Sequence, residues 1–230
     1  MAQVLWGEPP GPRRGPKPAL SREGIARAAI EVADAEGLAA VSMQRVAAAL
    51  GFTKMSLYRY VPGKTELVAL MAESAIGVPP DLEAESGRGW RVRLDAWARA
   101  LMEPMIRHPW TLEATVGPRV PGPNELAWVE AALTALEGTG LDGPERLDAV
   151  VTLTGHVRGI VQQAASVPGG APEAQLGAVI RELMREHGAR YPALAAAVDP
   201  AATGARDEAF DFGLARILDG LAALITARSG

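Results

Sequence analysis

Apolar residues recur three and four positions apart along most of this chain, which is the spacing of one face of an α-helix. Near the N-terminus the pattern predicts four short helices, bounded by Ser or Thr caps and by glycine or proline, over about residues 21–36, 43–50, 54–61 and 64–76. Farther along it predicts five longer helices, over about residues 88–107, 124–137, 144–167, 172–188 and 206–227. Alternating β-branched segments are absent, so the sequence predicts an all-α protein.

The distribution of charge divides the chain into two parts. Residues 1–64 hold nine Lys and Arg against five Asp and Glu, a net charge of +4; because the whole chain carries −4, the remainder carries −8. The stretch GEPPGPRRGPKP, residues 7–18, is too rich in proline and glycine for a helix, so we expect a flexible basic arm over residues 1–19. The chain thus has a small basic part, whose charge suits a polyanionic partner, and a larger acidic part, whose charge does not.

The composition excludes several kinds of chemistry. The chain has no cysteine, which rules out disulfides, thiolate nucleophiles and cysteine-ligated zinc. It has no apolar run long enough to span a bilayer and no segment of signal-peptide type, so we expect a cytoplasmic protein without a membrane partner. Its three histidines lack metal-ligand spacing and no phosphate-binding loop is present, so we expect neither an enzyme nor a bound cofactor.

The stretch VSMQRVAAALGFTKMSLYRYVPGKTEL, residues 41–67, places two short helices on either side of Gly51. This is the helix-turn-helix arrangement, in which the first helix braces the second and the second lies in the major groove of DNA. Because a helix of two turns is not stable alone, we expect Leu57 and Val61 to anchor the second one on its neighbours. Its other faces are then free to present polar side chains.

The side chains on those faces suit DNA. The donors that can reach phosphates or base edges are Lys54, Ser56, Tyr58, Arg59 and Tyr60. Arg59 suits a bidentate contact with guanine, and Met55 suits an apolar contact with a thymine methyl. Lys64 begins a helix whose positive end favours phosphate, and the caps Ser42 and Thr53 stand at helix starts that can also meet phosphates.

The roles of Tyr58 and of the basic arm each have an alternative. Tyr58 suits the core as well, where a buried tyrosine finds one partner for its hydroxyl, and the two roles are compatible. The RRGPK segment, residues 13–17, suits either a solvated tail or insertion into a minor groove. The sequence leaves both questions open.

The segment TKMSLYRYVPGKTEL, residues 53–67, resembles the bacterial tetracycline-repressor (TetR) family of transcriptional regulators, which carries the pattern LY-x-[HY]-[FV]-x-x-K-x-x-L there. The resemblance runs from about Leu20 to Ile76, and FDFGLARILDGL, residues 210–221, resembles the last helix of such regulators. It implies a DNA-binding domain over residues 20–66 and an effector-binding and dimerisation domain over residues 67–230. It also implies DNA-facing roles for Gln44, Thr53, Lys54, Met55, Ser56, Tyr58, Arg59, Tyr60 and Lys64.

The function that this resemblance implies is that of a ligand-responsive repressor. Such a protein binds a palindromic operator in double-stranded DNA as a homodimer, and a small-molecule effector releases it. The alternatives are an all-α interaction protein or an enzyme without DNA binding. The intact segment from Lys54 to Lys64 disfavours the interaction protein, and the lack of a catalytic constellation disfavours the enzyme.

The last predicted helix carries more apolar surface than a single buried face needs. The stripe consists of Phe210, Leu214, Ile217, Leu218, Leu221, Leu224 and Ile225. Because a core-facing stripe covers about a third of a helix, the excess indicates a second contact. We expect a symmetric four-helix interface made by helices 144–167 and 206–227 of two copies.

An aromatic and sulfur-rich set lies along the chain between the DNA-binding part and the expected dimer helices: Trp90, Trp97, Met102, Met105, His108, Trp110 and Trp128. Each of these residues alone suits an ordinary core. Together with His156 and Gln162 as polar groups, they suit the wall of an effector pocket. The tetracycline-binding branch of the family uses histidine in effector and metal binding, so we expect magnesium only if the effector resembles a tetracycline.

Overall fold

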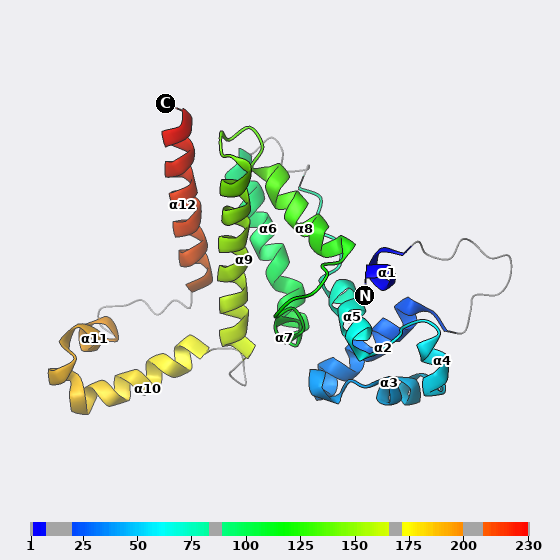
Figure 1. The fold of residues 1–230 in the computed structure, drawn as a ribbon. Helices are drawn as coiled ribbons and strands as arrows, with labels where there is room; N and C mark the ends of the chain where they lie inside the picture. The colour runs from blue at the N-terminus through cyan, green and yellow to red at the C-terminus, as the bar shows by residue number, and fades with distance from the viewer. Residues whose placement is uncertain (1, 8–19, 83–88, 166–171, 200–208, 230) are drawn as a thin grey trace.

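The computed structural model describes residues 2–7, 20–82, 89–165, 172–199 and 209–229, and all regular elements in these ranges are helical. Helices α2 to α5 form a compact group at one end, and α6, α8, α9 and α12 form a bundle of longer helices (Figure 1). The all-α prediction is confirmed. No helix in the described ranges is long and apolar enough to cross a membrane.

The N-terminal group consists of α2 (Arg22–Glu36), the short helix η1 (Leu38–Ala40), α3 (Met43–Leu50), α4 (Lys54–Tyr58) and α5 (Lys64–Ile76). The predicted caps are confirmed: the hydroxyl of Ser21 accepts from the amide of Gly24 at 3.0 Å, and that of Ser42 from Arg45 at 3.1 Å. Thr53 Oγ1 accepts from the amide of Ser56 at 3.3 Å. Each cap satisfies an amide that would otherwise lack an intrahelical partner, which fixes where the helix starts.

Helix α4 ends at Tyr58 and is therefore shorter than the predicted segment 54–61. Pro62 has no N–H to donate to the Tyr58 carbonyl, so the last hydrogen bond of helical spacing runs from Val61 to Leu57. Leu57 and Val61 are nevertheless both fully buried, among side chains of α2, α3 and α5 such as Leu67 and Met71. The expected anchoring of the short helix is therefore present.

The larger part is a bundle of α6 (Gly89–Arg107), α8 (Pro123–Ala135), α9 (Gly143–Ala165) and α12 (Ala209–Ser229), with the short helix α7 (Thr111–Ala114) at one end. Its core is built from the facing sides of these helices, with Trp97 of α6, Leu153 of α9 and Leu214 of α12 almost fully buried. Within the described ranges, the five longer helices agree with their predicted limits to within about three residues. The predicted helix residues 88, 166–167 and 206–208 lie outside the described residues.

Helix α5 belongs to both parts. Its residues Leu67 and Met71 lie in the core of the N-terminal group, whereas Ile76 packs against the core of the bundle. The boundary expected between residues 66 and 67 falls inside this continuous helix. The two parts are thus joined by a rigid element rather than by a linker.

The flexible arm expected over residues 1–19 instead begins with a helix, α1 (Ala2–Trp6). Val4 is buried, and the indole Nε1 of Trp6 donates to the carbonyl of Pro121 at 3.0 Å. Apolar contact and this hydrogen bond hold a helix too short to be recognised from periodicity. The basic RRGPK segment lies outside the described residues.

Helices α10 (Pro172–His187) and α11 (Pro192–Ala197), joined by η3 (Gly188–Arg190), extend away from the bundle on the side opposite α2–α4 (Figure 1). Sequence periodicity predicted α10 but missed α11 and η3, which are shorter than two turns. Apolar side chains of this extension are exposed, among them Leu176, Val179 and Leu183.

The anchoring of α4 makes a prediction about stability. Leu57→Ala should lower the free energy of unfolding by about 2–5 kcal/mol, because it removes a fully buried side chain and leaves a cavity. Met55→Ala, two residues away at a side chain that is 71% exposed, should change it by less than about 0.5 kcal/mol. Chemical denaturation of both variants measures the difference, and equal losses would contradict the anchoring role.

Candidate functional site

The predicted DNA-facing residues lie on α3, on α4 and at the start of α5, at the outer end of the N-terminal group (Figure 1). Seven of them are exposed: Ser42, Gln44, Thr53, Lys54, Met55, Arg59 and Lys64. Ser56, Tyr58 and Tyr60 are partly buried. No described carboxylate forms a salt bridge with Lys54, Arg59 or Lys64, so their charges face solvent.

Several polar groups of this surface are engaged locally. Thr53 Oγ1 and Ser56 Oγ lie 2.9 Å apart, and Lys54 Nζ stands 5.7 Å from the centre of the Tyr58 ring. Tyr58 also packs against the N-terminal core, as its core role predicts. The main-chain carbonyl of Tyr60 accepts from Arg22 Nε at 3.3 Å and ties the end of the α4 segment to α2.

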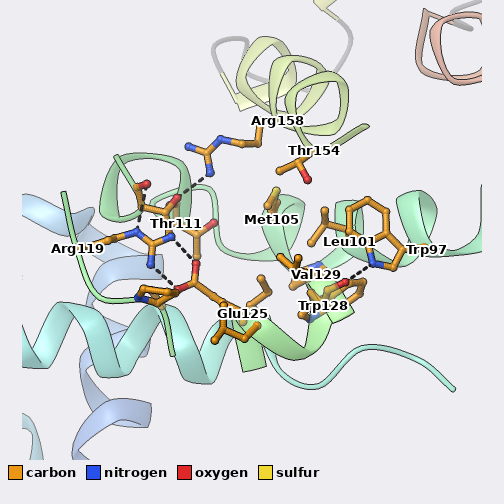
Figure 2. A pocket seen from close by; sticks show the side chains of 16 residues that line it. Trp97, Leu101, Met105, Thr111, Arg119, Glu125, Trp128, Val129, Thr154 and Arg158 are labelled. Atoms are coloured by element: carbon orange, nitrogen blue, oxygen red, sulfur yellow. Dashed lines mark hydrogen bonds and ion pairs between the residues drawn. The ribbon is translucent and has the colours of Figure 1, made fainter. Parts of the chain in front are cut away.

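A cavity of about 360 Å³ lies between α5, α6, α7, α8 and α9, within the size range of small-molecule sites. Its apolar wall is formed by Ala72, Ile76, Trp97, Leu101, Pro104, Met105, Pro121, Leu126, Trp128 and Val129. Its polar wall is formed by Thr111, Thr115, Arg119, Glu125, Thr154 and Arg158. Figure 2 shows the two tryptophans at one end and the charged side chains at the other.

The two tryptophans are held in fixed orientations. Their rings meet edge to face, with centroids 6.0 Å apart at an interplanar angle of 69°. Trp97 Nε1 donates to the carbonyl of Trp128 at 2.8 Å, and Trp128 Nε1 donates to that of Gly77 at 3.0 Å. With both indole donors satisfied, the rings offer the cavity only apolar surface.

The polar end is organised around Thr115. Arg158 Nη1 donates to Thr115 Oγ1 at 2.7 Å, and Arg119 Nε donates to the Thr115 carbonyl at 3.3 Å. Arg119 also forms a two-pronged ion pair with Glu125, which raises the pKa of the arginine. Arg158 donates to the carbonyl of Leu112 at 2.8 Å, and both of its described acceptors are uncharged.

A half-buried carboxylate, that of Glu73, connects this end to α5. Glu73 Oε1 accepts from the amide of Asn124 at 2.6 Å, and the Asn124 side chain donates to the Glu73 carbonyl at 3.0 Å. Glu73 Oε2 is buried, and no described residue hydrogen-bonds to it. Burial raises the pKa of Glu73, while the Asn124 amide acts in the opposite direction. The contact requires Gly122, where a Cβ atom would collide with the Glu73 carboxylate.

Of the nine residues predicted for an effector pocket, only Trp97, Met105 and Trp128 line the cavity. His108 and Trp110 instead turn toward α2, where His108 Nδ1 and Trp110 Nε1 lie 2.8 Å and 2.7 Å from Asp34 Oδ1. They hold the end of α6 and the start of α7 against the N-terminal group.

The other four predicted residues lie away from the cavity for different reasons. His156 stacks on the ring of Phe210, with its Nε2 2.9 Å from the Phe210 carbonyl, and so joins α9 to α12. Trp90 and Met102 pack against the bundle core, and Gln162 is exposed on α9. Among the described residues, no group of three or more His, Asp or Glu side chains is placed to hold a metal ion.

The charged and hydroxyl residues of the cavity were not predicted. Thr111, Thr115, Arg119 and Glu125 come from a short helix, a connection and the start of α8, where no periodicity marks an inward face. The sequence did contain a pattern that could have pointed to Thr154 and Arg158 as cavity residues. They lie one turn apart beside the buried stripe Leu153, Val157 and Val161, so polar residues border an apolar helix face there.

Two family models match the chain. Residues 25–71 match bacterial regulatory proteins of the tetR family, and residues 83–225 match the tetracyclin repressor-like C-terminal domain. These spans cover most of the N-terminal group and nearly all of the bundle and its extension.

Known proteins resemble the chain over almost its whole length. HTH-type transcriptional repressor DrrR1 of Streptomyces coeruleorubidus is 38% identical over 99% of this chain and 87% of the relative. A possible TetR family transcriptional regulator from Streptomyces coelicolor A3(2) is 28% identical, with a TM-score of 0.72 over 89% of this chain and all of that one. ActR of Streptomyces coelicolor, solved in complex with (S)-DNPA, is 25% identical, with a TM-score of 0.68 over 89% of this chain and 98% of that one.

The Glu73 contact predicts a pH dependence. The raised pKa means that the folded protein keeps the Glu73 proton to higher pH than the unfolded chain does. The stability that this proton contributes is fully present below about pH 4.5 and is lost as pH rises through the pKa of Glu73 in the folded state. Glu73→Gln has no such proton and should gain stability relative to wild type as pH rises above that range. Thermal unfolding between pH 4 and 8 measures this, with exposed Glu130→Gln on α8 as the control; parallel curves for wild type and Glu73→Gln would contradict it.

Proposed function

This chain belongs to the tetracycline-repressor family of bacterial transcriptional regulators, and we propose that it binds a palindromic operator as a homodimer and leaves it when a small molecule fills the cavity. The family consists of regulators, which are not enzymes. As a member, the chain is a ligand-responsive, DNA-binding transcriptional repressor.

The observation that carries the proposal is the exposure of Lys54 and Met55 on α4 and of Arg59 at its C-cap, while Leu57 fixes the buried side of the helix in the N-terminal core. In this proposal α4 lies in the major groove, with Arg59 reading a guanine and Met55 contacting a thymine methyl. Lys64 at the start of α5 meets a phosphate, helped by the exposed amides of the helix terminus. The remaining predicted contacts, Ser42, Gln44, Thr53, Ser56, Tyr58 and Tyr60, position the helix.

The dimer in this proposal forms through α9 and α12. Apolar side chains on these helices stay exposed in the single chain, including Leu147 and Val151 on α9 and Phe212 and Leu224 on α12. A large exposed apolar area on a soluble protein favours association. Two copies related by a twofold axis would bury these side chains in a four-helix interface and present two α4 helices to successive grooves about 34 Å apart.

The effector site in this proposal is the cavity between α5 and α9. The related ActR was solved with a small molecule, (S)-DNPA, and the cavity here has an apolar wall with a few polar groups at one end, as ligand sites commonly do. An effector acts only if it binds the DNA-free conformation better than the DNA-bound one. The cavity wall must therefore include elements that reach the DNA-binding surface.

Two elements fit this requirement. Helix α6 lines the cavity with Trp97, Leu101 and Met105, and just beyond its end His108 contacts Asp34 of α2. Helix α5 lines it with Ala72 and Ile76 and begins at Lys64. We assign both helices to the coupling between effector and DNA.

The DNA contacts are tested by two substitutions that should differ in kind. Arg59→Ala should cost about 1–3 kcal/mol of binding free energy and relax the preference at one operator position, because it removes a base contact. Lys64→Ala should weaken binding to all sequences alike and lower the salt dependence by about one counterion per half-site. Fluorescence anisotropy on DNA fragments selected from a genomic library, and on scrambled fragments, measures both.

The control for this experiment is Arg91→Gln, at an arginine on α6 that pairs with Asp219 of α12 and lies far from α4. It should bind DNA as wild type does. Wild-type affinity in both Arg59→Ala and Lys64→Ala would overturn the assignment of α4. A chain that selects no genomic fragment would favour an interaction protein without DNA binding.

The dimer is tested at the centre of the exposed α9 face. Val151→Glu, at a side chain that is 69% exposed in the single chain, should reduce the mass from twice the 24.1 kDa of one chain to that of one chain, because a buried unpaired charge opposes association. Val78→Glu, equally exposed in the connection after α5, should leave the mass unchanged. Light scattering during size-exclusion chromatography measures it, and a Val151→Glu dimer would rule out this interface.

A further inference from the structure

The guanidinium of Arg158 lies in the cavity wall without an ionic partner among the described residues. It reaches from α9 toward the polar end, and its described hydrogen bonds end on the hydroxyl of Thr115 and the carbonyl of Leu112 (Figure 2). Two neutral acceptors use two of its five N–H donors. A partly buried guanidinium that lacks a carboxylate is costly, because burial disfavours its charge.

A second positive charge stands close to it. Burial and then the nearby Arg119 guanidinium lower the pKa of Arg158, and only Glu125 acts in the opposite direction. Glu125 is already engaged by both prongs of Arg119. The cavity wall therefore holds two arginines and one carboxylate, a net charge of +1, within a chain of net charge −4.

Apart from the hydroxyls of Thr111 and Thr154, the rest of the cavity is lined by apolar side chains and has no charged group to match a second charge on a ligand. Opposite Arg158 the wall consists of Trp97, Trp128, Leu101 and Val129, and the indole donors of both tryptophans are used by carbonyls of the main chain. Such a surface favours a flat apolar body and offers nothing to a polar one. The cavity is thus cationic at one end and apolar at the other.

We propose that the effector is an acidic aromatic small molecule whose anionic oxygen group pairs with Arg158, next to Arg119, while its ring system lies against Trp97 and Trp128. This names the ligand class of the cavity and so rests on the proposed function of that cavity as the effector site. The anion supplies the partner that Arg158 lacks and offsets the repulsion between the two guanidinium groups. A neutral molecule of the same shape gains only the apolar contacts.

The test compares two fluorescent probes that differ by one charged group. 1-Anilinonaphthalene-8-sulfonate is anionic, and N-phenyl-1-naphthylamine has the same rings without the sulfonate. Wild type should bind the anionic probe at least about 10-fold more tightly than the neutral one. Arg158→Gln should weaken the anionic probe by about 10- to 100-fold and change the neutral one by less than about 3-fold.

Two further variants separate this inference from the function of the cavity. Arg107→Gln removes an exposed arginine of α6 that pairs with Glu103, outside the cavity, and should leave both affinities unchanged. Val129→Trp fills the cavity and should abolish the binding of both probes. Thr154→Phe, on the facing helix, serves the same purpose if Val129→Trp does not fold.

Each outcome bears on one claim. If both probes bind the two filled variants as they bind wild type, the cavity is not the ligand site and the proposed effector site fails. If filling abolishes binding but wild type shows no preference for the anion, or Arg158→Gln keeps that preference, only the acidic-ligand inference is overturned. The wild-type preference is decisive even if Arg158→Gln is unstable, and Arg158→Lys, which retains the charge, should then preserve most of it.

Discussion

The packing of Leu57 and Val61 in the N-terminal core is the constraint on which the rest depends. Five residues of α4 cannot hold a helix in water, so its conformation is imposed by α2, α3 and α5. That imposed position keeps the opposite side of α4 exposed and free of ion pairs with the described carboxylates. Binding can then use side chains that are already in place, which reduces the entropic cost of recognition.

The cavity shows how one site combines two kinds of selectivity. Its tryptophans are fixed by hydrogen bonds to main-chain carbonyls, so the apolar end has a defined shape. Its arginines meet at Thr115, so the charged end has a defined position as well. In the proposed effector site, a ligand that matches both ends at their set separation is favoured over a molecule that matches only one of them.

The elements that the sequence predicts well are those with local signals. Ser21, Ser42 and Thr53 start their helices where expected, because a cap and the first turn involve neighbouring residues only. Helix α1 was not predictable, since the contact of Trp6 with Pro121 joins distant positions. The end of α4 was misplaced because Pro62, which lacks an N–H, leaves the carbonyl of Tyr58, four residues earlier, without its helical partner.

The cavity was predictable only in part, and the reason is again distance along the chain. Trp97, Met105 and Trp128 were found because large apolar residues on amphipathic helices face inward. His108 and His156 drew attention by residue type, yet Asp34 and the Phe210 carbonyl use them as contacts between helices. Arg119, Glu125 and Arg158 come from separate segments, and only the folded chain brings them together.

The shared helix α5 has a mechanical consequence. From Ile76 in the cavity wall to Lys64 at the DNA-facing end it runs twelve residues, or about 18 Å at 1.5 Å per residue. A rigid rod of that length tilted by about 3° at Ile76 moves Lys64 by about 1 Å, so it acts as a lever between the two cores. Displacements too small to unpack the cavity can thus shift Lys64, the proposed phosphate contact, by a sizeable fraction of a hydrogen bond's length.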